Sequence, residues 1–191
     1  MAEPVTLQTL LTYLTLISVP VGVFYHIMTL RNTRKNQETQ LETRQAQLFM
    51  NLYETYRSLE FRKQWTMILQ QEWTDIDDFM EKYGSDNNPE AWSNWMSVAS
   101  FFHGIGILVK KGLVQPSLLD ELISPNVFMA WVMMGPIVKG FEEYVKRPSI
   151  RNRYRDAEGH SFSKIFKSWS GFEYLYDELK RREQQQLELN T

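Results

Sequence analysis

The chain of 191 residues carries 21 Lys and Arg, 23 Asp and Glu, and a formal net charge of −2. This near-neutral balance gives no general attraction to nucleic acid, and the lack of cysteine excludes a disulfide-stabilised exterior domain. A chain of this length can bury one hydrophobic core, and its many aromatic residues, including six Trp, indicate a packed domain rather than a disordered one.

The first predicted element is a helix over residues 7–30, which contain no Asp, Glu, Lys or Arg. Such a helix is about 36 Å long, and the hydrocarbon core of a bilayer is about 30 Å thick. Glu3 is the only charged side chain before the run and no small-x-small cleavage pattern follows it, which argues against a cleaved secretory signal. We therefore expect a single transmembrane helix. A helix buried in a soluble core is the alternative, because interspersed Thr, Ser, Pro, Gly and His dilute the hydrophobicity.

Three basic residues, Arg31, Arg34 and Lys35, follow the run directly. Because basic flanks stay on the cytoplasmic side of a membrane, the expected orientation places the N-terminus, residues 1–6, outside. The remainder of the chain is then expected in the cytoplasm, against the inner face of the plasma membrane.

Small and polar residues recur within the run at spacings of three and four, which is one face of a helix. They are Gln8, Thr12, Thr15, Val19, Gly22, His26 and Thr29. Small and hydroxylated side chains let membrane helices approach closely and hydrogen-bond, so Thr12, Thr15, Gly22 and His26 are candidates for self-association. Alternatively, the Thr hydroxyls donate hydrogen bonds to carbonyls of their own helix. His26 is either a polar anchor near the headgroups or a pH-sensitive group.

Helical patterns continue through the rest of the chain. We expect a juxtamembrane stalk at 31–47, in a helix that reaches about residue 71, and then a capped helix at 75–83. A helix from Pro89 to Lys111, capped by Gly112, and a short helix from Pro116 to Ile123 follow. The last two are a helix from Pro125 that bends at Gly135–Pro136 and a final helix that frays into a polar tail at 183–191. No strand alternation persists. The predicted fold class is all-α, with a compact helical bundle domain over residues 48–182.

A basic segment is the candidate binding feature of that domain. Arg147, Arg151, Arg153 and Arg155 lie within ten residues. Arg guanidinium groups bind phosphate oxygens, and lipid headgroups are the nearest phosphates for a membrane-tethered domain. The alternative is a solvated surface with internal salt bridges.

Candidate catalytic and metal sites are weak in this sequence. His103 is a potential general base, but the sequence favours a hydrogen-bonded core histidine, and His160 with Glu158 supplies only two metal ligands. The acidic residues from Glu72 to Glu81 fit the first turn of a helix. Gly104-x-Gly106 lacks the context of a nucleotide motif and favours close helix packing instead. We expect no catalytic residue, no cofactor and no metal.

Four stretches together resemble an uncharacterised prokaryotic family of small single-span membrane proteins with a cytoplasmic helical domain. They are TRQAQLFMNLYETYRSLEFRKQW, WSNWMSVASFFHGIGILVKKGLV, WVMMGPIVKGFEEYVKRP and FEYLYDELKRR. The resemblance implies an architecture and a prokaryotic source, but no activity and no site residues.

The sequence thus favours a non-enzymatic, membrane-anchored module for protein interaction or self-assembly. Its expected partners are membrane lipids, a further copy of the chain and a protein that the sequence does not identify. The alternatives are a membrane-surface enzyme that uses His103 or His160, and a subunit of an oligomeric channel or transporter.

Overall fold

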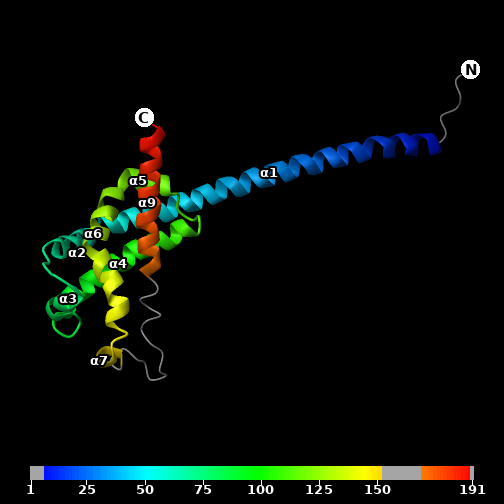
Figure 1. Ribbon diagram of the computed structural model, residues 1–191. Coiled ribbons are helices and arrows are strands. Elements are labelled where there is room, and N and C mark those ends of the chain that lie inside the picture. Colours follow the sequence, from blue (N-terminus) through cyan, green and yellow to red (C-terminus); the bar gives the residue numbers. More distant parts are fainter. Residues whose placement is uncertain (1–6, 152–168, 190–191) are drawn as a thin grey trace, which may run out of the picture. The chain divides into compact units, whose positions relative to one another are not determined.

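The computed structural model describes residues 7–151 and 169–189, apart from the side chains at 9, 10, 13, 15, 17, 19, 142, 149 and 151. Within these residues the chain is all-helical, as predicted (Figure 1). The helices are α1 (Leu7–Arg57), α2 (Leu59–Leu69), α3 (Ile76–Tyr83), α4 (Pro89–Lys110), α5 (Pro116–Leu122), α6 (Ser124–Tyr144), α7 (Pro148–Arg151) and α9 (Ser170–Leu189).

The chain divides into two units, an N-terminal unit of residues 1–46 and a helical domain of residues 47–191. In the N-terminal unit, the described large apolar side chains of α1 are exposed to solvent. They face every direction around the helix axis except that of the small and polar face that carries Gly22 and His26. Leu14 and Leu16, two residues apart, are separated by about 200° around the axis, and Val21 and Val23 repeat this relation. No element of this unit covers them.

Among the residues that the structure describes, no single helix is long and apolar enough to cross a membrane. By length and composition alone, a pair formed by α5 and residues Ser124–Phe141 of α6, bent by 85° where they meet, is long and apolar enough to cross a membrane. This criterion gives no support to the predicted transmembrane helix at residues 7–30.

The predicted helix that ends near residue 71 is wrong at one point, because it is broken at Ser58. The backbone of Ser58 leaves the helical region at φ −59° and ψ 146°, and its Oγ accepts a hydrogen bond from the Phe61 amide at 3.1 Å. A serine that caps a new helix in this way satisfies a donor that would otherwise be unpaired. The break starts α2, which packs against α4.

Local signals set the other helix ends of the domain as the sequence predicts. The Asn88 side chain caps α4 by accepting from the Ala91 amide at 3.0 Å, and Pro89 occupies the first turn. Gly112 follows α4 with φ +68°, a left-handed conformation that favours glycine. Pro136 lies inside α6, which continues to Tyr144.

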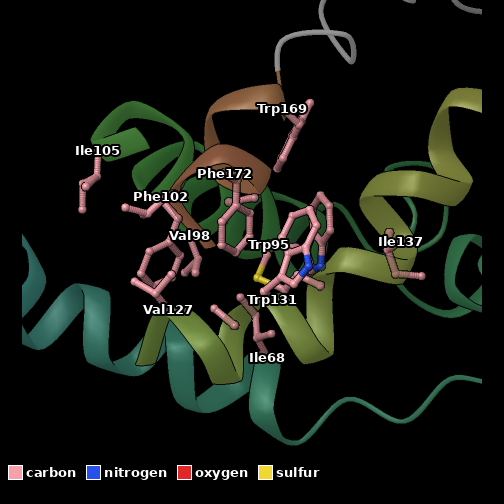
Figure 2. Close-up of a cluster of buried hydrophobic side chains, with 14 of the residues drawn as sticks. Ile68, Trp95, Val98, Phe102, Ile105, Val127, Trp131, Ile137, Trp169 and Phe172 are labelled. Carbon is pink, nitrogen blue, oxygen red and sulfur yellow. The ribbon is translucent and has the colours of Figure 1, made fainter. Parts of the chain in front are cut away.

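The core of the domain lies around α4, which packs against α2, α3 and α9, while α6 packs against α3 and α9. Phe102 of α4 and Phe172 of α9 are fully buried and stack with ring centroids 5.2 Å apart. Trp131 of α6 meets Phe172 edge-on at 5.0 Å. Figure 2 shows Phe102, Phe172, Trp131 and Trp95 gathered in this cluster. Aromatic packing across three helices therefore joins distant parts of the sequence.

The close approach of α4 and α9 depends on two glycines. A Cβ added to Gly106 would lie 1.7 Å from the Gly171 carbonyl oxygen, and one added to Gly171 would lie 2.5 Å from the His103 carbonyl oxygen. Both obstacles are backbone atoms, which cannot turn away as a flexible side chain can. Gly104, on the same helix, has no atom within 4 Å of its added Cβ. The prediction that glycines here permit close helix packing is confirmed at Gly106 but not at Gly104.

Substitution of Gly106 by Ala should therefore lower the free energy of unfolding by at least about 2 kcal/mol, because the two helices must separate. Substitution of Gly104 by Ala is the matched control and should raise it by up to about 1 kcal/mol through higher helix propensity. Urea unfolding followed by circular dichroism measures both. Equal effects of the two substitutions would contradict the crossing described above.

Candidate functional site

The basic segment begins with an ion pair inside the domain. Arg147 follows α6, and its guanidinium binds the carboxylate of Asp77 in the first turn of α3. The same guanidinium lies over the Tyr144 ring, 5.2 Å from its centroid. The hydrogen bond with Asp77 raises the pKa of Arg147 above its usual value. Arg147 thus ties the end of α6 to the start of α3, which is the internal salt bridge that the sequence left as an alternative to phosphate binding.

Arg147 is the one arginine of this group whose side chain is among the described residues. Arg151 is the last residue of α7, and its side chain lies outside the described residues, as do Arg153 and Arg155 entirely. Their predicted contact with phosphate stays a prediction.

The candidate self-association face of α1 is partly occupied by bonds within the helix. The Thr12 hydroxyl donates to the Gln8 carbonyl at 2.8 Å, and the Thr29 hydroxyl donates to the Tyr25 carbonyl at 2.9 Å. These are the bonds to the preceding turn that formed the alternative interpretation. The hydroxyl oxygens can still accept a hydrogen bond. The space around Gly22 is open for at least 4 Å beyond an added Cβ, and the side chain of Thr15 lies outside the described residues.

His103 has a structural role at the α4–α9 crossing. Its half-buried ring accepts, through Nδ1, a hydrogen bond from the Gly171 amide at 3.2 Å. Burial lowers the pKa of His103 below its usual value, against a smaller opposing effect of a hydrogen bond with the Trp169 backbone. An accepting Nδ1 places the ring proton on Nε2 and requires the neutral imidazole. A protonated ring would lose this acceptor.

The acidic residues before and within α3 also have a structural role. The Asp75 carboxylate caps the helix by accepting from the amides of Asp77 and Asp78, each at 3.0 Å. Asp78 accepts from the Thr74 amide at 2.9 Å and pairs with Lys82. No three His, Asp or Glu side chains among the described residues are placed to hold a metal ion. His160 and Glu158 lie outside those residues.

A pocket of about 260 Å³ lies where the end of α2 meets the end of α3 and the start of α4. Gln71, Asn88, Glu90 and Asn94 contribute polar groups to its lining. The Gln71 Oε1 atom is shielded from solvent and has no hydrogen-bond partner among the described residues. Sequence reasoning missed this pocket. Its only signal is the pair of amides Gln70–Gln71 at a helix end, which becomes meaningful only when α4 is seen beside it.

The described residues define a small all-helical protein in which a packed domain follows an apolar N-terminal helix. The family model of DUF4760, a domain of unknown function, matches residues 16–157. The chain therefore belongs to this family, which confirms the expectation of an uncharacterised family. The match bears neither on a membrane location nor on a prokaryotic source. No curated protein and no solved structure matches the chain.

The His103 contact predicts a specific pH dependence of stability. Because the folded-state pKa of His103 lies below the unfolded value of about 6.5, the unfolded chain binds more protons between these two values. The free energy of unfolding should therefore decrease as the pH falls below about 6.5. The Asn of His103→Asn offers Oδ1 near the position of Nδ1 but does not titrate, so this variant should lose that part of the dependence.

The measurement is urea unfolding of both proteins at pH 7.5, 6.5, 5.5 and 5.0, and the difference between the two pH profiles isolates the contribution of residue 103. His103→Leu, which leaves the Gly171 amide without an acceptor, should cost about 1–3 kcal/mol at pH 7.5. An identical pH dependence in His103→Asn and the natural chain would contradict the role of His103.

Proposed function

We propose that the protein is a membrane-anchored helical module that mediates protein interaction or self-assembly at the inner surface of the plasma membrane. One observation carries the proposal. Residues 7–30 contain no charged side chain, and their described large apolar side chains are exposed on every side of α1 except the small and polar face. The membrane, the proposed partners and the orientation are inferences from this pattern and from its flanks.

A helix that is apolar over most of its circumference requires an apolar environment on those sides. Eleven large apolar side chains of residues 7–30 are exposed, namely Leu7, Leu11, Leu14, Leu16, Val21, Val23, Phe24, Tyr25, Ile27, Met28 and Leu30. Burying each stabilises by about 1.5–3 kcal/mol, so their joint transfer from water is favourable by on the order of 20 kcal/mol. A bilayer supplies that environment without any further protein, and a helix of this length matches its thickness.

The flanking charges support one orientation of this anchor. Arg31, Arg34 and Lys35 follow the apolar run, and Glu3 is the only charged side chain before it. The positive charges favour the cytoplasmic face, so the helical domain faces the cytoplasm. There the basic segment from Arg147 to Arg155 is available to anionic headgroups, where Arg147 would exchange Asp77 for a lipid phosphate.

Interaction is favoured over catalysis because His103, the described candidate for a general base, accepts a hydrogen bond from the Gly171 amide and so serves the fold. Self-assembly is supported by the open surroundings of Gly22, where a second helix can approach closely.

Two lysines in the apolar run should weaken the attachment of the protein to the membrane. Leu16→Lys with Val23→Lys adds two charges on the same face of the helix, because seven residues make nearly two full turns, at about 2.5–3.5 kcal/mol per residue near the bilayer centre. The matched control, Gln37→Lys with Gln40→Lys, adds the same charge to the polar part of α1. The measurement is alkaline carbonate extraction of membranes from cells that express the chain. We expect the natural chain and the control in the pellet and a larger share of the double variant in the supernatant. A natural chain that is extracted as readily as the double variant would refute the anchor.

Gly22→Leu should reduce the oligomer size in mild detergent, because the added side chain keeps two α1 helices apart. Analytical ultracentrifugation provides the measurement. Val23→Leu changes a position about 100° away from Gly22 around the helix and serves as the control, with no expected change. If Gly22→Leu sediments like the natural chain, self-association through this face is wrong.

A further inference from the structure

We propose that the pocket at the junction of α2, α3 and α4 binds a small ligand that carries a protonated amine on a short apolar body. The pocket lies wholly within the helical domain. The proposal is therefore independent of the membrane anchor, and either can fail without the other.

The pocket is framed by three helix ends. Met67 and Gln70 come from the last turn and C-cap of α2, with Gln71 directly after it, and Tyr83 is the last residue of α3. Ala91 belongs to the first turns of α4. A volume of about 260 Å³ is close to the lower limit of ligand pockets, and a water molecule occupies about 30 Å³. The space suits a ligand of a few heavy atoms.

The unpaired Oε1 atom of Gln71 is the first feature that points to a ligand. Buried polar atoms are almost always hydrogen-bonded, and an unpaired acceptor lowers stability. The Gln71 Oε1 atom is such an acceptor. Since no bond holds this oxygen, and since the terminal torsion of a Gln side chain is soft, the amide can turn Oε1 toward the pocket at little cost. A donor placed there by a ligand would satisfy it.

The neighbouring polar groups also offer acceptors, because several of their donors are already used. The Asn94 Nδ2 group donates to the Met67 sulfur at 3.2 Å, which leaves the Asn94 carbonyl oxygen for another donor. The Tyr83 hydroxyl is engaged with the backbone of Glu72, accepting from its amide at 3.2 Å. Glu90 is the charged residue of the lining, and it is negative. These groups fit an ammonium, which brings three donors and a positive charge.

Helix dipoles do not reverse this preference. The positive end of α4 favours an anion at the pocket, but the negative end of α2 opens onto the same space and favours a cation. The Asn88 side chain already binds the Ala91 amide, and Glu90 adds negative charge to the first turn of α4. The two dipoles oppose each other, so the carboxylate of Glu90 decides the sign. Met67, Ala91 and the Tyr83 ring provide the surface for an apolar body.

The test is titration of the full-length chain in detergent with n-butylammonium chloride, and with sodium n-butyrate as the anion of similar size. The measurement is the movement of the Asn94 side-chain amide signals in nuclear magnetic resonance spectra. We expect saturation in the millimolar range with the amine and none with the acid. Gln71→Met and Glu90→Gln should each raise the dissociation constant at least about fivefold.

Gln115→Met is the matched control, since Gln115 is exposed and makes no capping bond, and it should bind like the natural chain. Gln71→Met also replaces an unpaired amide by an apolar group, so its melting temperature without ligand shows whether the variant is folded. No saturable shift with the amine would overturn the proposal. Equal binding of butyrate, or binding unchanged in both pocket variants, would overturn it as well.

Discussion

The crossing of α4 and α9 is the constraint on which the domain depends. Gly106 and Gly171 lie against each other so closely that a Cβ on Gly106 would meet the Gly171 carbonyl oxygen at 1.7 Å. This approach lets Phe102 and Phe172 stack, and it allows the Gly171 amide to donate a hydrogen bond to His103 Nδ1. An electrostatic bond at the far end, between Arg182 of α9 and Asp120 of α5 at 2.7 Å, holds the same helix from another side. Backbone contact, aromatic packing and polar bonds thus reinforce one arrangement.

The two units of the chain differ in the burial of their apolar side chains. In the helical domain they line the interior, and the last turns of α1 take part: Phe49 is buried, and the Tyr56 hydroxyl accepts a hydrogen bond from Asn126 of α6. In the N-terminal unit the same kind of residue is exposed around most of the helix. A water-exposed surface of that kind is unfavourable. The proposed function follows from this contrast, since lipid or a second copy of the chain would cover the exposed apolar surface of α1.

Polar residues that sequence reasoning treats as candidate chemistry have roles in the fold. His103 accepts a backbone amide, Asp75 caps α3, and Arg147 joins α3 to the end of α6 through Asp77. The most informative polar group is one that serves nothing in the fold, the buried Oε1 atom of Gln71. An unpaired polar atom beside a pocket is a stronger indication of binding than a paired charge on the surface, because only the former gains a bond without losing one.

By itself, the sequence determined the all-helical class, the charge-free run at residues 7–30, and the helix ends that have local causes. Asn88–Pro89 and Gly112 mark the ends of α4 because capping acts between residues within one turn. Only the tertiary structure decided which features of the sequence matter across distance. In the structure the long helix is broken at Ser58, although the apolar periodicity alone predicts that it continues. The structure also shows that an added Cβ would collide with α9 at Gly106 but would meet nothing at Gly104. It also made a pocket from Gln71 and Asn94, because residues from separate helices meet only when the helices pack.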